Sequence, residues 1–256
     1  MNYEDAIEQI CDQLKEFMED AGAKKAVVGL SGGIDSSVIA YLCVKALGEE
    51  NVVGISMPYD KQDQSDALLV AEKLGIPCNI VNILPMVSSF PDHLQRDKLQ
   101  KGNIMARVRM TVLYAYANTL GGLVIGTTNK TEAMIGYYTK WGDGAVDVEP
   151  IAELYKTDVW EVGKILGVPK CIINKAPSAG LWEDQTDEGE LGMTYKELDK
   201  ILKKQGDGGF SLLGEGFSGA MRKKAVKVAQ LRSSTQHKRE MPESFKIYTK
   251  TTKIHC

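Results

Sequence analysis

The stretch Gly29-Leu30-Ser31-Gly32-Gly33-Ile34-Asp35-Ser36-Ser37 joins a run of β-branched residues to an apolar segment of helical length. Its glycines let backbone N–H groups approach phosphate oxygens, its serines add hydroxyl donors, and the helix start after it supplies partial positive charge. The loop has neither the lysine of a Walker A motif nor the G-x-G-x-x-G of a dinucleotide-binding turn. The stretch therefore predicts a strand, a phosphate-binding loop and a helix, in that order.

The same residues also allow a structural interpretation. In it the two glycines form a turn, and Asp35 and Ser36 cap the helix that follows, a combination found in many α/β proteins. The rest of the sequence has to decide between the two.

Short β-branched runs alternate with amphipathic segments through the first half of the chain. The runs at residues 25–30, 51–57, 78–83 and 123–128 have the length and composition of strands. The segments at 35–48, 64–75 and 103–122 have helical length, and each ends at glycine, as helices often do. This alternation predicts an α/β fold with a doubly wound parallel sheet flanked by helices, followed by C-terminal helices, in a single domain of residues 1–256.

Two long stretches rich in glycine and charge, residues 137–150 and 174–192, interrupt the second half. Long irregular loops in compact domains tend to be functional. We expect a helix at 153–167 between them and two terminal helices at about 194–205 and 216–232.

Composition narrows the class of protein. With 31 basic and 34 acidic residues the formal net charge is -3, so no overall field favours nucleic acid or an anionic membrane. No apolar run approaches the ~20 residues that span a bilayer, and the acidic N-terminal segment has the spacing of an amphipathic helix rather than a signal peptide. The five cysteines are scattered, without a C-x-x-C pair, which argues against a disulfide framework and a zinc site. We therefore expect a cytoplasmic protein.

The complete run at residues 31–37 resembles the pyrophosphatase loop of the ATP pyrophosphatases, the adenine nucleotide alpha hydrolase superfamily. Members of that superfamily cleave ATP between the α- and β-phosphates, so the resemblance implies adenylation. Further motifs resemble ammonia-dependent NAD synthetases and follow that family's order from about residue 25 to residue 242. These motifs are residues 101–110, 126–127, 132–144, 147, 150–156, 177–182 and 237–239.

The resemblance implies a ligase that forms a C–N bond. ATP would adenylate the carboxylate of nicotinic acid adenine dinucleotide (deamido-NAD), and ammonia would displace AMP to give NAD, with pyrophosphate released. ATP as co-substrate, Mg²⁺ as cofactor and a homodimer are implied, with no nucleic-acid or membrane partner. Glutamine-dependent relatives carry an additional amidohydrolase domain, for which this chain has no room, so we expect free ammonia as the nitrogen donor.

The resemblance also implies the residues of the site. ATP is expected to contact Gly29, Leu30, Ser31, Gly32, Gly33, Ile34, Asp35, Ser36, Thr127, Lys156 and Ser178. Deamido-NAD is expected to contact Arg107, Lys140, Asp147, His237 and Lys238. Asp35 and Glu132 are expected to hold Mg²⁺. Asp35, Lys156 and Asp143 are the expected catalytic residues, and Asp143 would take a proton from ammonium.

Elementary chemistry supports several of these assignments and leaves alternatives for others. Carboxylates are ligands that Mg²⁺ prefers, but Glu132 also has the position of a solvated acid in a first helical turn. Lys156 begins a helix, where a cation does not suit the dipole, so a nearby phosphate would compensate. Arg107 and Arg109 are two apart on a helix and cannot share a face, so we expect one to reach ligand while the other pairs or is solvated.

Two motifs keep a simpler interpretation. The Gly-Asp-Gly that contains Asp143 is also a common turn sequence, and His237-Lys238 has the character of an exposed basic tail. Among the three tryptophans we expect Trp182, in the second long loop, to close over ligand.

Two other functions remain open. An adenylating synthetase for another carboxylate or for a tRNA base would need a basic nucleic-acid face or a catalytic cysteine pair, and the sequence offers neither. A nucleotide-binding regulatory domain of the universal-stress type would have no use for Asp35, Glu132 and Lys156 together.

Overall fold

A four-stranded parallel sheet forms the centre of the computed structural model, which describes residues 1–182, 184–206 and 216–247. The strands are β1 (Lys25–Gly29), β2 (Val52–Ser56), β3 (Cys78–Ile80) and β4 (Gly122–Ile125), in the order β3-β2-β1-β4. All neighbouring pairs are parallel. The predicted fold class is therefore confirmed.

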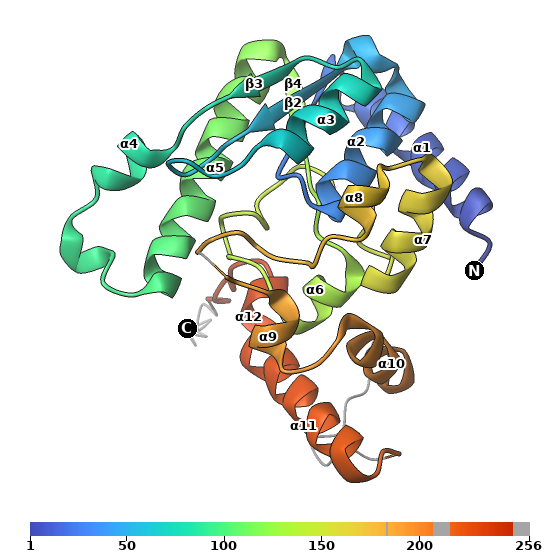
Figure 1. Ribbon diagram of the computed structural model, residues 1–256, viewed down its shortest axis with the longest axis vertical. Coiled ribbons are helices and arrows are strands. Elements are labelled where there is room, and N and C mark those ends of the chain that lie inside the picture. The colour runs from blue at the N-terminus through green and yellow to red at the C-terminus, as the bar shows by residue number, and fades with distance from the viewer. Residues whose placement is uncertain (183, 207–215, 248–256) are drawn as a thin grey trace, which may run out of the picture.

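Helices cover both faces of the sheet and form a group at one end of it (Figure 1). In chain order they are α1 (Tyr3–Asp20), α2 (Ile34–Leu47), α3 (Ser65–Leu74), α4 (Leu84–Ser88), α5 (Lys98–Leu120), α6 (Lys130–Ile135), α7 (Lys156–Leu166), α8 (Lys170–Ile173), α9 (Asp187–Leu191), α10 (Tyr195–Gln205), α11 (Gly219–Ser234) and α12 (Gln236–Arg239). None of the described helices combines the length and apolar character needed to cross a bilayer.

Several boundaries differ from the predicted ones. The helix expected at 103–122 begins at Lys98, because the Asp97 side chain caps it by accepting the backbone N–H of Gln100. The helix expected from residue 153 begins only at Lys156, and the Asp158 carboxylate accepts the N–H of Tyr155 just before it. The third strand is also shorter than expected, since only three residues pair with β2.

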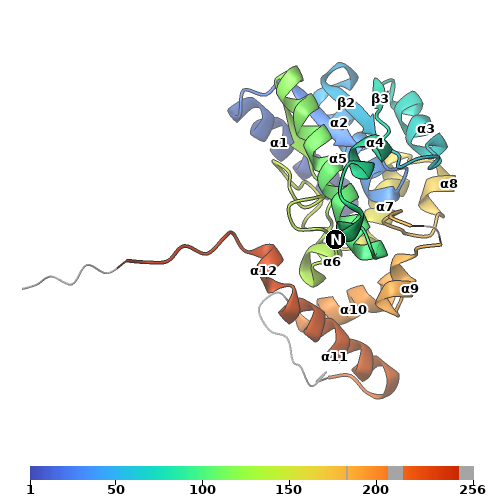
Figure 2. The ribbon, with the colours of Figure 1, turned by 90° about the vertical axis from the view of Figure 1, so that its left-hand side faces the viewer.

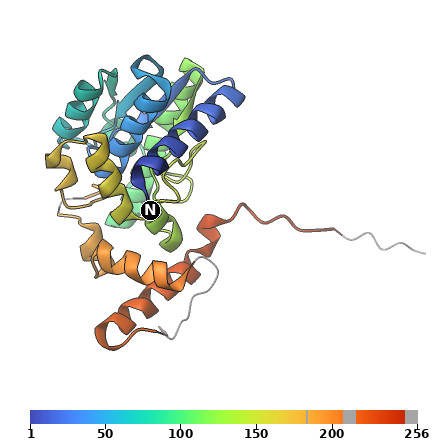
Figure 3. The ribbon, with the colours of Figure 1, turned by 90° about the vertical axis from the view of Figure 1, so that its right-hand side faces the viewer.

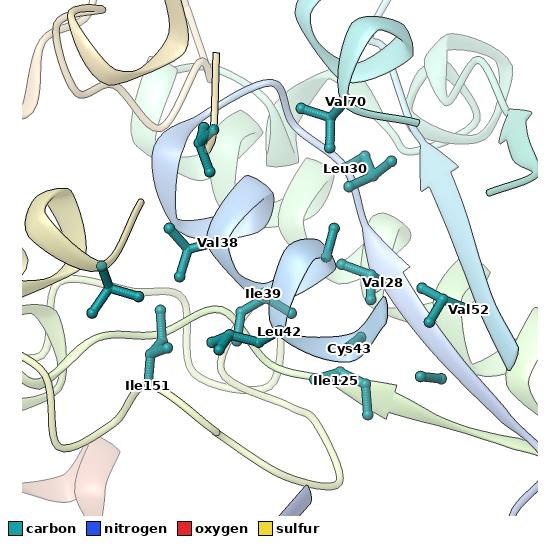
Figure 4. Close-up of a cluster of buried hydrophobic side chains, with 14 of the residues drawn as sticks. Val28, Leu30, Val38, Ile39, Leu42, Cys43, Val52, Val70, Ile125 and Ile151 are labelled. Carbon is teal, nitrogen blue, oxygen red and sulfur yellow. The ribbon is translucent and has the colours of Figure 1, made fainter. Parts of the chain in front are cut away.

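Two apolar cores lie on opposite faces of the sheet. Adjacent residues of a strand point to opposite faces, so Val28 packs with α1, α2, α3 and α7 while Val27 packs with α4 and α5. Figure 4 shows the first core, where Val38, Ile39 and Leu42 of α2 lie against the strands. Burial of the strands on both faces is what a doubly wound parallel sheet requires.

The stripe on α1 belongs to the first core. Ile7, Cys11, Leu14 and Met18 are buried there, whereas Phe17, which has the same helical spacing, is 37% exposed. The α5 residues Leu113 and Ala117 likewise pack into the second core. The buried residues of α1 and α5 are therefore not available to form a subunit interface.

A third apolar cluster joins the C-terminal helices to the body. Tyr195, Leu198 and Ile201 of α10 pack with Ala225 and Val228 of α11 and with the end of α6. Figures 2 and 3 show α10 and α11 as a layer beyond the carboxyl ends of the strands, while residues 240–247 run away from the body. Cys11, Cys43, Cys78 and Cys171 are free thiols, and Cys256 lies outside the described residues.

The strand order locates the expected ligand crevice. The chain moves outward from β1 to β2 and β3, then returns to place β4 on the other side of β1. In sheets of this kind ligands bind beyond the carboxyl ends of the strands at such a reversal. The glycine loop follows β1 and Thr127 follows β4, so both lie at this point.

Candidate active site

A buried ammonium between two carboxylates is the centre of the candidate site. The Lys156 Nζ lies 2.5 Å from Asp35 Oδ2 and 2.9 Å from Glu132 Oε1. The lysine side chain is 3% exposed, and the two acids are 18% and 15% exposed. The sequence placed these three residues together, and the structure brings them into direct contact. The alternative in which Glu132 is a solvated helix acid is wrong.

Asn129 holds both acids in place. Its side-chain amide donates to Asp35 Oδ1 over 2.9 Å, and its carbonyl oxygen accepts the backbone N–H of Glu132 over 3.1 Å. The second contact is the N-cap of α6, completed when the Glu132 carboxylate accepts the backbone N–H of Asn129. Asn129 is fully buried. It was not among the predicted site residues, although an Asn three positions before a Glu is a capping signal.

Charge explains why a lysine can begin α7. Burial acts to lower the pKa of Lys156, but the charges of Asp35 and Glu132 and their hydrogen bonds outweigh it and raise that pKa. The Asp199 carboxylate lies at the same helix start, where it accepts the N–H of Thr157 and the hydroxyl of Thr131. Asp35 and Glu132 therefore compensate the cation at this helix start.

Asp35 and Glu132 suit a Mg²⁺ ion that is bound together with a nucleotide. Within residues 1–182, 184–206 and 216–247, no three acidic, histidine or cysteine side chains are grouped as an all-protein metal cage. Mg²⁺ commonly uses one or two carboxylates and takes its other oxygens from phosphates and water. Asp35 and Glu132 supply such a pair beside the glycine loop.

The glycine loop is organised by its own hydroxyls. Ser36 Oγ donates to the Gly33 carbonyl and accepts the N–H of Ser31, and Ser37 Oγ also donates to Gly33. Gly32 has a φ of +75°, and a side chain there would meet Asp66 at 2.9 Å. The residue at the helix N-cap is Gly33, without a side-chain cap, and Asp35 points instead to Asn129 and Lys156. The structural-cap interpretation of Asp35 is therefore wrong.

Glu149 is a second carboxylate at this edge that the sequence did not single out. Its Oε2 accepts the N–H of Thr128 over 3.0 Å. Burial raises the pKa of Glu149 to about 7, against the opposing effect of the Thr128 hydrogen bond. The carboxylate lies so close to Gly126 that a Cβ at that position would meet Oε2 at 2.3 Å. The half-buried Thr127 lies between these two contacts in the chain.

Most of the residues expected to bind the dinucleotide form a second group. Arg107 Nη2 donates to the Lys140 carbonyl over 3.2 Å, and Lys140 Nζ donates to the carbonyl of His237 on α12. Lys238 Nζ donates to the carbonyls of Gly136 and Tyr138 over 2.8 and 2.6 Å. Arg107, Lys140, His237 and Lys238 thus meet where α12 returns to the body. The exposed-tail interpretation is wrong for Lys238, which is half-buried, whereas His237 is exposed.

The two aspartates of the first long loop accept hydrogen bonds from different parts of the chain. Asp143 Oδ1 accepts the N–H of Thr139 over 2.9 Å. Asp147 accepts the N–H of Val124 over 2.7 Å and the Tyr114 hydroxyl over 3.2 Å, which ties the loop to β4 and α5. Both carboxylates therefore shape this loop, and both remain accessible to solvent.

The second long loop is fastened on both sides. Gln62 Nε2 donates to the Gly180 carbonyl over 2.6 Å, and Gln62 Oε1 accepts the Arg109 guanidinium over 3.1 Å. On the other side, Ala179 donates its N–H to Asp187. Ser178 is exposed and directly precedes these two anchored residues. Of the two arginines on α5, Arg109 is thus the paired one, and Arg107 is exposed.

Trp182, which was expected to close over ligand, lies in the same loop and is partly buried.

Comparison with known proteins identifies relatives along nearly the whole chain. The family model described as NAD synthase matches residues 6–242. The NH(3)-dependent NAD(+) synthetase of Thermococcus kodakarensis is 55% identical over 205 residues, which cover 79% of this chain and 81% of that protein. The enzyme of the same name from Pyrococcus horikoshii is 48% identical over 241 residues, or 92% of this chain and 93% of its own.

Solved structures agree with this relationship. The NMN synthetase from Francisella tularensis superposes with a TM-score of 0.85 at 36% identity, covering 96% of this chain and 100% of that chain. The NH3-dependent NAD synthetase from Campylobacter jejuni, in complex with the nitrate ion, superposes with a TM-score of 0.77 at 29% identity over the same shares.

Proposed function

Because this chain belongs to the NAD synthase family, we propose that it catalyses the ATP-dependent amidation of deamido-NAD by ammonia, the last step of NAD biosynthesis. The carboxylate is first adenylated, and ammonia then displaces AMP. The enzyme is a ligase that forms a C–N bond. The observation that carries the proposal is the Asp35–Lys156–Glu132 cluster beside a glycine loop at the carboxyl ends of β1 and β4.

The cluster suits the charge that the reaction has to move. Oxide cannot leave a carboxylate readily, so AMP becomes the leaving group and pyrophosphate departs from ATP. Negative charge develops on that pyrophosphate and must be neutralised in a site already organised for it. Lys156 is the buried cation available for this role, and Asp35 and Glu132 keep it charged until phosphate arrives.

We assign Asp35 and Glu132 as the protein ligands of Mg²⁺. When bound, the ion supplies charge neutralisation for the phosphate oxygens of ATP. The chain's own residues orient the nucleotide. The proposed ATP contacts are Gly29, Leu30, Ser31, Gly32, Gly33, Ile34, Asp35, Ser36, Thr127, Lys156 and Ser178.

The substrate end lies where α12 meets the first long loop. Arg107, Lys140, Asp147, His237 and Lys238 are the proposed contacts of deamido-NAD. Asp143 is the proposed base that takes a proton from ammonium, so that neutral ammonia attacks the acyl adenylate. Asp143→Asn should lower the rate most at neutral pH and least as the pH approaches the pKa of ammonium, because free ammonia then becomes abundant.

A cytoplasmic homodimer is the proposed form of the enzyme. Light scattering behind a sizing column measures the molar mass directly, and a monomeric mass with full activity would contradict this part of the proposal.

A second substrate is favoured by one specific comparison. The Francisella structure with the TM-score of 0.85 is an NMN synthetase. The corresponding candidate here is amidation of nicotinic acid mononucleotide, which presents the same carboxylate without the adenylate half. Competition between the two acids at equal concentration distinguishes these functions, because kcat/KM ratios set the product ratio.

The testing experiment is a coupled assay with purified protein, ATP, Mg²⁺, ammonium and deamido-NAD, omitting each component in turn. NAD is followed with a dehydrogenase, and AMP and pyrophosphate by chromatography. NAD formed in step with AMP, and lost in Asp35→Ala, supports the proposal. If ATP is cleaved only when another acid is supplied, that acid and not deamido-NAD is the substrate. If ATP binds without being cleaved, the regulatory-domain alternative is favoured.

A further inference from the structure

Asp187 and Tyr195 are two buried polar residues that the proposed reaction does not use. Asp187 begins α9 and is 4% exposed, and Tyr195 begins α10 and is fully buried. Buried groups of this kind need partners, because an unsatisfied one is costly. Their partners lie in two different parts of the candidate site.

Asp187 fastens the segment that carries Ser178. Its Oδ1 accepts the N–H of Ala179 over 3.1 Å, and its own N–H donates to the Pro177 carbonyl over 3.0 Å. One residue thus binds the chain on both sides of Ser178. Movement of Asp187 would move this proposed ATP contact.

Tyr195 connects the same carboxylate to the central cluster. Its hydroxyl donates to Asp187 Oδ2 over 2.9 Å and lies 3.5 Å from Glu132 Oε1. Its ring lies 5.0 Å from the Lys156 ammonium and meets Trp160 edge to face, with centroids 6.1 Å apart. These contacts and full burial hold the phenol beside the cluster.

We propose that Asp187 and Tyr195 are positioning residues that hold the Ser178 segment and the Glu132–Lys156 cluster in one arrangement for the nucleotide. The argument rests on the proposed function, in which Ser178 and Lys156 both contact ATP. A hydroxyl carries a single hydrogen, and Tyr195 directs it to Asp187 while its ring supports the ammonium. The two ATP contacts, one in the second long loop and one at the start of α7, therefore share one support.

The variant Tyr195→Phe tests the positioning role of the Tyr195 hydroxyl. The variant keeps the ring beside Lys156 and Trp160 and removes only the hydroxyl. We expect kcat/KM for ATP to fall about tenfold or more, because loss of geometry in a site is felt strongly in the rate.

Tyr137→Phe is the matched control. The Tyr137 hydroxyl donates to Glu190 over 2.7 Å and lies 3.3 Å from Asp187 Oδ1, but among the described residues its oxygen makes no hydrogen bond to Glu132 or Lys156. It should change kcat/KM by no more than about threefold while costing similar stability. Equal losses of activity in the two variants would overturn the proposal, since a general effect on folding would act through both.

A double-mutant cycle separates positioning from stability. Ser178→Ala, Tyr195→Phe and the double variant are compared by kcat/KM for ATP. Since Tyr195 is proposed to act through the Ser178 segment, its effect should shrink markedly in the Ser178→Ala background. Fully multiplicative losses would show that the two residues act independently.

Hydrogen exchange tests the link through Asp187 independently of the proposed function. In Tyr195→Phe, the peptide containing Ala179 and Gly180 should exchange faster than in Tyr137→Phe, with or without ATP. If Ser178→Ala leaves the KM for ATP unchanged, the proposed role of Ser178 fails, yet faster exchange would still support the link through Asp187. Unchanged exchange in Tyr195→Phe would reject the link itself.

Discussion

The ammonium of Lys156 lies 2.5 Å from a carboxylate oxygen of Asp35 and bridges it to Glu132. These are the same two carboxylates that we assign to Mg²⁺. The Lys156 ammonium and the proposed metal therefore share the same two carboxylates. Binding of ATP would draw the ammonium toward phosphate and leave the carboxylates to the metal.

Lys156→Met should destabilise the protein and expose this exchange. Removing the cation leaves two buried acids facing each other, at a cost of about 3–5 kcal/mol in the free energy of unfolding by urea. Mn²⁺ without nucleotide should raise the Tm of the variant and leave that of the original protein nearly unchanged.

Lys164→Met supplies the control, because the Lys164–Glu161 pair is about half exposed and should contribute less than about 1 kcal/mol. Stabilisation of the original protein by Mn²⁺ alone, to the same degree as the Lys156 variant, would contradict the exchange.

Asn129→Ala should cost more than an ordinary helix cap. It removes the cap of α6 and leaves Asp35 Oδ1 without its donor, together about 2–3 kcal/mol in urea unfolding. Asn2→Ala removes an exposed cap of α1 and should cost about 1 kcal/mol. ATP-dependent AMP formation should fall only in the first variant; equal stability losses and intact activity in both would refute the double role.

Glu149→Gln should stabilise the protein at alkaline pH. Burial raises the pKa of Glu149 to about 7, so the folded state holds this proton more tightly than the unfolded state. Its contribution is most favourable below the unfolded pKa and is lost as pH rises through about 7. The amide keeps an acceptor for Thr128, so the variant should gain about 1–3 kcal/mol at pH 8 and little at pH 4.

Urea unfolding across this pH range makes that measurement, with Glu153→Gln as the exposed control whose side chain is 87% accessible. A gain independent of pH would rule out titration of Glu149 as its source.

Gly126→Ala should be tolerated only when Glu149 is shortened. The new Cβ would meet the Glu149 carboxylate at 2.3 Å, which forces a displacement that costs about 1–3 kcal/mol. In the double variant with Glu149→Ala that cost should largely disappear. Thermal or urea unfolding of the single and double variants checks this, and additive losses would show that the clash is not the cause.

The sheet and the glycine loop followed from sequence because their signals are local. β-branched runs, glycine helix ends and the order of residues 29–37 need no knowledge of distant contacts. Boundaries were less accurate where one side chain decides them, as Asp97 does at the start of α5.

The environment of Lys156 shows where local reasoning stops. A lysine at a helix start indicated a nearby anion, but not that Asp35 and Glu132, 121 and 24 residues away, would contact it. Tyr195, Asp187 and Glu149 have no motif of their own. Their burial next to the cluster depends on how α9, α10 and the loop before Pro150 pack, and no spacing in the sequence encodes that.

The return of α12 to the body has a consequence for how the enzyme is made. Lys238 is fastened to carbonyls 102 and 100 residues earlier, beside the loop that carries Asp143. Chains fold from the N-terminus as they leave the ribosome, so the sheet and glycine loop are available before α12 emerges. A nascent or truncated chain would have the glycine loop but an incomplete amidation end, and it could form product only after α12 had been synthesised.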